Sequence, residues 1–166
     1  MMAGQSHYTP PTPEFDEAPS VLIVVAPYYK DIADDLLAGA RRALEAAGAT
    51  HETVEVPGAL EIPTAIGIAH RTAEFDGFVA LGCVIRGETT HYETVCNDSS
   101  RGLTMLGLSG ACIGNGILTV ENYDQAAVRA GEQDKGGGAA AAALHLIALS
   151  RKWRNAPSGI GFKPKG

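Results

Sequence analysis

A continuous apolar run, Val79–Ile85, constrains the fold of this chain more than any other stretch. The run is rich in β-branched residues and has no polar alternation, which predicts a strand buried on both faces of a sheet. Arg86 and Gly87 end it, and Thr90 with Glu93 three positions later matches the capping box of a helix. The stretch therefore predicts a strand, a tight turn and a helix. Open α/β sheets bind ligands at the carboxyl ends of such strands, and the free N–H groups of a helix start attract anions such as phosphate.

The same order of strand and helix is repeated along the chain. The expected strands are Val21–Ala26, Thr50–Val56, Val79–Ile85 and a segment within Ala111–Val120. The expected helices run from Asp31 to a stop at Gly48, over Leu60–Ala73, from Thr90 to Gly107, from Asn122 to about Ala130, and over Ala139–Arg151 after a break at Gly136–Gly138. Alternating strands and helices require a parallel sheet with helices on both faces. The prediction is an α/β fold, a flavodoxin-like three-layer α/β/α sandwich with a four-stranded parallel sheet in the order 2-1-3-4.

Composition limits the organisation of the chain and its partners. With 166 residues, 45% of them hydrophobic, the chain is long enough for one well-packed domain, which we place at residues 21–154. Residues 1–20 are rich in proline and polar residues and are predicted to be a flexible arm, and residues 155–166 a flexible tail. A net charge of −6 argues against nucleic-acid binding, and we find neither a run of membrane-spanning length nor the apolar region of a signal peptide.

The cysteines and histidines give no sign of a metal site. The three cysteines are widely spaced and form no C-x-x-C pair, so we expect buried, reduced thiols in a cytoplasmic protein. No two histidines have the spacing of a metal site such as H-x-x-x-H.

Polar side chains that directly follow the predicted strands are candidates for one site. They belong to Tyr28, Gly58–Glu61 and Arg86–His91, and parallel strands bring these positions to one edge of a sheet. His91, in the first turn of a helix, is the best candidate for an acid/base group; the simpler interpretation is an exposed histidine at a helix start. Glu61 could accept hydrogen bonds from sugar hydroxyls, or could only stabilise the start of its helix.

Two basic residues further along the chain are candidates for binding phosphate. Arg129 lies on the fourth predicted helix and Lys135 precedes three glycines, although each also fits a solvated helix face or a salt bridge. Two common phosphate motifs are excluded. Gly82 and Gly87 have Walker A spacing, but Glu88 stands where that motif needs lysine, and no G-x-G-x-x-G follows the first strand.

Three blocks of sequence together carry a family resemblance. They are VPGALEIP (Val56–Pro63), GCVIRGETTHYETVCN (Gly82–Asn97) and GNGILTVENYDQAAVRA (Gly114–Ala130). They resemble the 6,7-dimethyl-8-ribityllumazine synthase family, and the similarity runs from about Val21 to Trp153. The resemblance implies a transferase of riboflavin synthesis. Such an enzyme condenses 5-amino-6-(D-ribitylamino)uracil with 3,4-dihydroxy-2-butanone 4-phosphate to 6,7-dimethyl-8-ribityllumazine, releasing phosphate and water, with neither a metal nor a cofactor.

The resemblance also implies roles for the reacting and phosphate-binding groups. His91 falls on the catalytic histidine of the family, which moves protons during imine formation, phosphate loss and ring closure. Glu88 and Thr89 fall on the segment that holds the butanone phosphate. Arg129 matches a phosphate-binding arginine, and Lys135 a second basic group.

A second set of residues is matched to the binding of ribitylaminouracil. In this set Tyr28 is the aromatic residue that stacks on the ring, Glu61 accepts from the ribityl hydroxyls, and Cys83 contributes only its backbone. The set comprises Tyr28, Ala59, Leu60, Glu61, Cys83, Val84, Ile85 and Asn115.

Asn115 is the main departure from the family pattern. Many members have an aromatic residue there, contributed by a neighbouring subunit of a ring-shaped pentamer. Asn115 is expected to precede the fourth strand, whereas the other site residues follow their strands, so a neighbour would have to supply it. We therefore expect a homo-oligomer, a pentamer or a multiple of pentamers, with sites between subunits.

Two other functions remain open at the level of the sequence. A non-catalytic flavin- or lumazine-binding protein on the same scaffold is slightly favoured by Asn115, but His91, Thr89 and Arg129 argue against it because a carrier needs no phosphate pocket. A purely structural shell protein is the third possibility.

Overall fold

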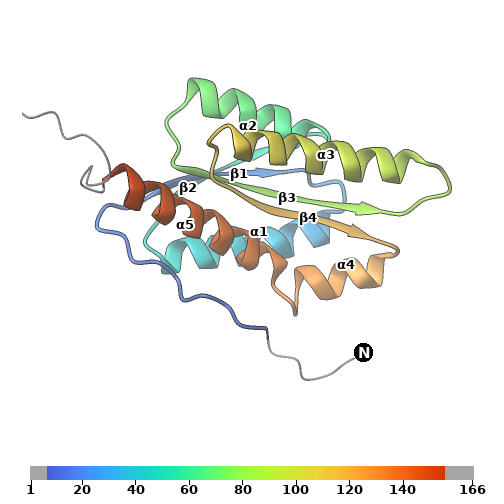
Figure 1. Cartoon of the computed structure of the whole chain (residues 1–166). Helices are drawn as coiled ribbons and strands as arrows, with labels where there is room; N and C mark the ends of the chain where they lie inside the picture. The colour runs from blue at the N-terminus through green and yellow to red at the C-terminus, as the bar shows by residue number, and fades with distance from the viewer. Residues whose placement is uncertain (1–6, 156–166) are drawn as a thin grey trace, which may run out of the picture.

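A four-stranded parallel sheet forms the centre of the computed structural model, which describes residues 7–155 (Figure 1). The strand order is β2-β1-β3-β4 and each neighbouring pair is parallel, so the predicted fold class and order are confirmed. The elements in chain order are β1 (Ser20–Val25), α1 (Lys30–Ala46), β2 (Thr50–Glu55), α2 (Glu61–Thr72), β3 (Gly77–Ile85), α3 (His91–Leu108), β4 (Ile113–Val120), α4 (Tyr123–Ala130) and α5 (Lys135–Arg154). The division into arm, domain and tail remains a prediction, and residues 1–6 and 156–166 lie outside the described residues.

Helices cover both faces of the sheet. Figure 1 shows α2 and α3 over one face and α1, α4 and α5 over the other. Strand β1 contributes to both interfaces: Leu22 and Val24 pack in the core under α2 and α3, whereas Val21, Ile23 and Val25 pack with α1, α4 and α5. Successive side chains of a strand point to opposite faces, so a strand covered on both sides has no position left for a polar residue.

Two of the predicted helix ends are confirmed. Gly48 follows α1 with φ +73°, a left-handed conformation that suits glycine after a helix. The side chain of Asn122 caps α4 by accepting a hydrogen bond from the backbone N–H of Gln125 at 2.9 Å.

The predicted N-cap of α1 is wrong, and the capping box predicted for α3 does not form. Asp31 lies inside the first turn of α1, whose N-cap is Tyr29. Thr90 does stand at the N-cap of α3, but its side chain makes no capping hydrogen bond. Its backbone is already helical (φ −71°, ψ 0°), whereas a capping hydroxyl needs an extended backbone. The side chain of Glu93, which would complete the capping box, pairs instead with Arg86.

The predicted break at Gly136–Gly138 is also wrong, because α5 begins at Lys135 and contains these glycines in its first turn. The reason is the close packing of α5 on α1. A Cβ at Gly136 would lie 2.0 Å from the carbonyl oxygen of Leu36 on α1, so only glycine fits there. Asp134, with φ +46°, caps the helix by accepting a hydrogen bond from the N–H of Gly137 at 3.1 Å.

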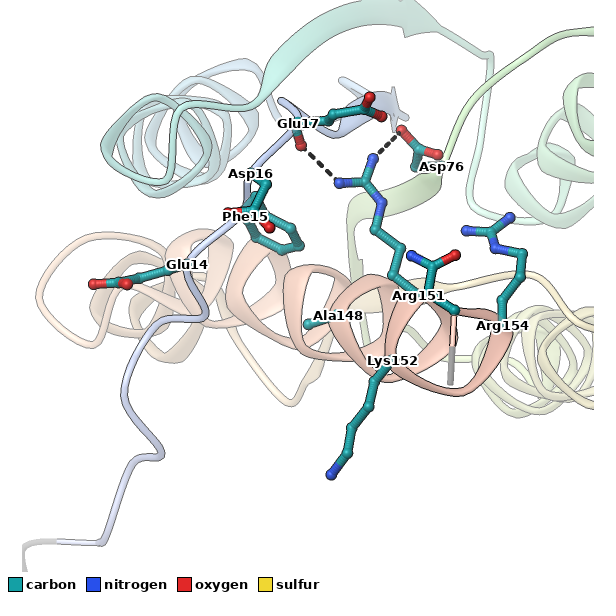
Figure 2. Close-up of a pocket in the computed structure, with 10 residues that line it drawn as sticks. Glu14, Phe15, Asp16, Glu17, Asp76, Ala148, Arg151, Lys152 and Arg154 are labelled. Atoms are coloured by element: carbon teal, nitrogen blue, oxygen red, sulfur yellow. Dashed lines mark hydrogen bonds and ion pairs between the residues drawn. The ribbon is translucent and has the colours of Figure 1, made fainter. Parts of the chain in front are cut away.

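Arg151 on α5 holds the described part of the N-terminal arm, residues 7–19, against the rest of the chain. Its guanidinium donates to the carbonyl oxygen of Glu17 at 2.6 Å and to Oδ2 of Asp76 at 3.2 Å, as Figure 2 shows. It also lies 5.5 Å from the centre of the Phe15 ring. These residues border a cavity of about 780 Å³ near the amino ends of the strands. The cavity is larger than the candidate site described below, but its partly buried Arg151 is already paired with Asp76 and the carbonyl oxygen of Glu17.

Replacing Arg151 by methionine is expected to loosen the arm. Chymotryptic cleavage after Phe15 should become ~10-fold faster, because a charge-assisted hydrogen bond contributes about 1.5–3 kcal/mol to keeping a segment closed. Limited proteolysis followed by mass spectrometry measures the rate. Lys152→Met is the control, since this exposed neighbour points away from the arm (Figure 2). Equal rates in the two variants would show that Arg151 does not hold the arm.

Candidate active site

A cavity of about 430 Å³ opens at the carboxyl ends of the strands, a volume typical of small-molecule sites. Its walls come from the segments that follow β1 and β2, from the end of β3 and from the start of α3. The lining residues are Tyr28, Tyr29, Pro57, Gly58, Ala59, Leu60, Glu61, Cys83, Val84, Ile85, His91 and Val95.

Most of the residues predicted to bind ribitylaminouracil meet in this cavity, together with the predicted catalytic histidine. These residues are Tyr28, Ala59, Leu60, Glu61, Cys83, Val84, Ile85 and His91. The remaining predicted site residues do not line it: Glu88, Thr89, Asn115, Arg129 and Lys135. One chain therefore brings together most of the residues predicted to bind ribitylaminouracil, but none of the four residues predicted to bind phosphate.

The open edge of β3 forms one wall of the cavity. The pairing of β1 with β3 ends at Val25 and Leu81, whereas β3 continues to Ile85 and pairs only with β4 over this last part. The carbonyl oxygen of Leu81 faces β1, where it accepts from the N–H of Ala26 at 2.9 Å. Because backbone groups alternate along a strand, the N–H and C=O groups of Cys83 and Ile85 face the same side, where β1 no longer pairs with them. This edge is suited to hydrogen bonding with a planar heterocycle.

Glu61 supplies a carboxylate to the opposite part of the cavity. It starts α2, where a negative charge is stabilised by the helix dipole. The preceding turn is closed by the N–H of Glu61, which donates to the carbonyl oxygen of Gly58 at 3.1 Å. A Cβ at Gly58 would lie only 3.0 Å from Oε2 of Glu61, so the glycine makes room for the carboxylate. Within residues 7–155 this carboxylate makes no hydrogen bond or ion pair, which leaves its oxygens able to accept from ligand hydroxyls.

Two tyrosines after β1 line the cavity. The rings of Tyr28 and Tyr29 pack edge to face with centroids 5.0 Å apart, and Tyr28 is 76% exposed. Tyr29 is half-buried, and burial raises the pKa of its phenol. An exposed ring held in place by a partly buried one offers a face for stacking on a flat ligand.

Cys83 lies on the cavity wall but is not activated as a nucleophile. Burial raises the pKa of its thiol to about 11, so the thiol is protonated at neutral pH. Cys96 and Cys112 are also free thiols, and burial is the largest cause of their raised pKa values. All three are partly exposed, so the expectation of fully buried thiols is wrong.

His91 stands at the first position of α3, with its side chain exposed at the mouth of the cavity. Its backbone N–H donates to Oγ1 of Thr89 at 3.3 Å, so the hydroxyl predicted to contact phosphate already contacts the start of the helix. Glu88 and Thr89 are exposed and lie on the loop that leads into this helix. The loop therefore places His91 and the free N–H groups of α3 beside the cavity.

Asn115 lies in another groove of the same chain. The expectation that it precedes the fourth strand is wrong, because it is within β4, where its Oδ1 accepts from the N–H of Ile117 at 3.0 Å. It does lie near the amino end of the strand, opposite to the cavity. The groove that it lines has a volume of about 580 Å³ and includes Leu108 and Trp153, which are 85% and 67% exposed.

Arg129 and Lys135 also lie apart from the cavity of their own chain. Arg129 is on α4 and donates to the carbonyl oxygen of Gln125 at 3.1 Å. Lys135 is the exposed first residue of α5.

Several lining residues were not predicted as site residues. Tyr29 is one of them, and its position directly after a buried strand, beside Tyr28, is the signal in the sequence that points to it. Val95 packs in the core beneath α3, and its surface also closes the cavity. Within residues 7–155 no group of three or more histidine, cysteine, aspartate or glutamate side chains could hold a metal ion.

Comparisons with known proteins agree with these features. The family model described as 6,7-dimethyl-8-ribityllumazine synthase matches residues 18–151. A protein of that name from Jannaschia sp. (strain CCS1) is 60% identical over 99% of this chain and 94% of its own length. Its namesake from Sphingopyxis alaskensis is 56% identical over 85% of this chain and 98% of its own length. The one from Agrobacterium fabrum is 57% identical over 81% of this chain and 96% of its own length.

These comparisons confirm the resemblance seen in the sequence and do not favour the non-catalytic carrier. The chain belongs to the 6,7-dimethyl-8-ribityllumazine synthase family, and it is a transferase enzyme of riboflavin biosynthesis.

Proposed function

We propose that this enzyme condenses 5-amino-6-(D-ribitylamino)uracil with 3,4-dihydroxy-2-butanone 4-phosphate in the cavity at the carboxyl edge of the sheet. The products are 6,7-dimethyl-8-ribityllumazine, phosphate and water. One observation carries the proposal: the unpaired edge of β3, the carboxylate of Glu61 and the imidazole of His91 line a single cavity of about 430 Å³.

Each wall of the cavity suits one part of the substrates. The backbone groups of Cys83 and Ile85 match the donors and acceptors of a pyrimidine ring, on which Tyr28 stacks. Glu61 accepts hydrogen bonds from the ribityl hydroxyls. His91 transfers protons during imine formation and dehydration, while the N–H groups at the start of α3, beside Thr89, bind the butanone phosphate. The chain's contribution is the alignment of two substrates, which accounts for much of the rate acceleration in such condensations.

We further propose that the site is completed by an adjacent subunit in a pentamer. The groove around Asn115 exposes Leu108 and Trp153, and exposed apolar surfaces of this kind mark protein–protein contacts. The groove and the cavity lie at opposite ends of the sheet. When the groove of one subunit packs against the cavity of the next, the two subunits contribute different surfaces to the interface. Repeated head-to-tail contacts of this type form a ring when the rotation between successive subunits closes, as it does in the proposed pentamer. The neighbour then supplies Asn115 to the ring-binding wall, and Arg129 and Lys135 to the phosphate.

We place the enzyme in the cytoplasm. Its three cysteines are free thiols, which suits a reducing compartment. As a separate observation, none of the helices within residues 7–155 is long and apolar enough to span a membrane.

A direct assay tests the proposed reaction. The purified protein is mixed with both substrates, and formation of the yellow lumazine and release of phosphate are followed in parallel. Equal amounts of both products, formed well above the uncatalysed rate, are the expected result. A folded protein that accelerates neither, and that retains flavin through purification, would instead act as a carrier.

Arg129→Ala is expected to raise KM for the butanone phosphate by ~10-fold or more, with KM for ribitylaminouracil unchanged. The expected cause is the loss of a charge-assisted hydrogen bond to the phosphate. Steady-state kinetics with each substrate varied in turn measure both constants. Arg42→Ala, which removes an exposed arginine of α1, is the control. An unchanged KM for the butanone phosphate would exclude Arg129 from the site.

A further inference from the structure

Arg86, the first residue after β3, directly follows the cavity-lining Ile85 and joins three elements. Its backbone N–H donates to the carbonyl oxygen of Val120 at 2.9 Å. Its Nε donates to Oε2 of Glu121 at 2.7 Å, directly after β4, and its Nη1 donates to Oε1 of Glu93 in the first turn of α3. The guanidinium also lies over the ring of Tyr92, 4.4 Å from its centroid.

These contacts enclose the loop Gly87–Thr90, which links β3 to His91. Arg86 stands at one end of the loop, and its side chain pairs with Glu93 beyond the other end. Ion pairs of Arg86 with two carboxylates join the first turn of α3 to the ends of β3 and β4. This guanidinium therefore helps to fix the position of the loop relative to the cavity.

The charges around Arg86 argue against a direct role in phosphate binding. Two carboxylates, those of Glu93 and Glu121, already neutralise the guanidinium, and they raise its pKa. The pKa of Glu93 is lowered by a hydrogen bond from its own backbone N–H and by Arg86. The cluster as a whole carries an excess negative charge, so it does not attract the phosphate of a substrate.

Because the cluster is exposed, its removal should change the position of the loop without lowering the stability of the whole fold. The side chains of Arg86, Glu93 and Glu121 are 42%, 47% and 57% exposed. Exposed ion pairs contribute little to the stability of a whole fold. A shift of about 1 Å in a reacting group can nevertheless slow a reaction by ~100-fold. Loss of the cluster should therefore change the kinetic constants of the enzyme, with little effect on its free energy of unfolding.

We propose that Arg86 is a positioning residue, which fixes the loop Gly87–Thr90 and the imidazole of His91 against the open end of β3. The proposal rests on the function proposed above, since it acts through His91 and through Glu88 and Thr89 of the phosphate segment.

Steady-state kinetics of Arg86→Met test the proposal. KM for the butanone phosphate should rise ~10-fold and kcat should fall several-fold, because both the phosphate segment and His91 are displaced. KM for ribitylaminouracil should change less than ~2-fold, because Tyr28 and Glu61 lie on other segments. Arg86→Lys should recover part of the loss, since lysine can pair with one carboxylate but cannot span both. Arg42→Met, at an exposed arginine 3.9 Å from Asp134, should change neither KM.

Hydrogen exchange gives a readout that does not depend on turnover. The amides in the first turn of α3 should exchange faster in Arg86→Met than in the unmodified protein, with the rest of the sheet unchanged. Unaltered exchange and kinetics, or an equal loss for both substrates together with faster exchange throughout the chain, would overturn the proposal. Failure of the unmodified enzyme to form lumazine would refute the proposed function, whereas the exchange experiment would still decide whether Arg86 fixes this turn.

Discussion

Leu108→Asp is expected to break up the assembly and to lower kcat/KM by at least ~100-fold, while each subunit stays folded. Leu108 is 85% exposed at the end of α3 and supports no core of its own chain, so the substitution does not disturb the fold. In the proposed ring the same side chain is buried against a neighbour. An unpaired carboxylate there disfavours association by more than about 3 kcal/mol, a shift of more than ~100-fold in the assembly equilibrium.

Sedimentation velocity and steady-state kinetics at the same protein concentration measure the two parts of this prediction. Val54→Asp is the matched control, because Val54 is also an exposed apolar residue but lies on β2, at the opposite edge of the sheet from β4. Isolated subunits with undiminished activity would contradict a site shared between subunits. An intact assembly would exclude the groove from the interface.

Gly136→Ala is expected to lower the free energy of unfolding by about 2–3 kcal/mol. The added methyl group would meet the carbonyl oxygen of Leu36 at 2.0 Å, so α5 would have to move away from α1 and disturb the packing between them. Backbone atoms, unlike the end of a long side chain, cannot turn aside to relieve such a contact. The effect should appear as a lower urea midpoint with an unchanged slope.

Gly138→Ala is the control for this experiment. Gly138 lies in the same turn of α5, but no atom lies within 4 Å of a Cβ built there. Alanine should therefore stabilise the helix at this position, by up to about 1 kcal/mol. Protein concentration must be held constant, because assembly adds to apparent stability. Equal destabilisation by both substitutions would show that the backbone geometry at the start of α5, and not the contact with α1, is the reason for glycine at these positions.

The strands, their order and most of the cavity could be predicted because they depend on local patterns. Val21–Val25 and Val79–Leu81 are apolar at each position, which is typical of central strands. Tyr28 follows the first of these strands, and Cys83–Ile85 form the end of the second. The glycines of α5 misled the prediction because the reason for them is a carbonyl group about 100 positions earlier in the chain. No local pattern contains that contact.

The start of α3 shows the same limit at the site itself. Thr90 and Glu93 have the spacing of a capping box, but the carboxylate of Glu93 forms an ion pair with Arg86, which follows β3. The ion pair depends on where the ends of β3 and β4 lie in space, which is a property of the folded sheet. Asn115 is a further case: one chain holds it away from the cavity, and its role depends on a second copy.

The stagger between β1 and β3 has a consequence for the evolution and engineering of specificity. In the proposed site, β3 extends beyond β1 and its exposed peptide groups bind the heterocycle. Recognition of the ring would then depend on the length of the strand and not on the identity of its side chains. Substitutions of the Cys83 or Val84 side chain should thus have little effect on which heterocycle the site binds. Insertions or deletions that lengthen β1 or shorten β3 would close the edge. Natural or designed variants of this fold are then expected to change their preference for a heterocycle when the pairing register of β1 and β3 changes.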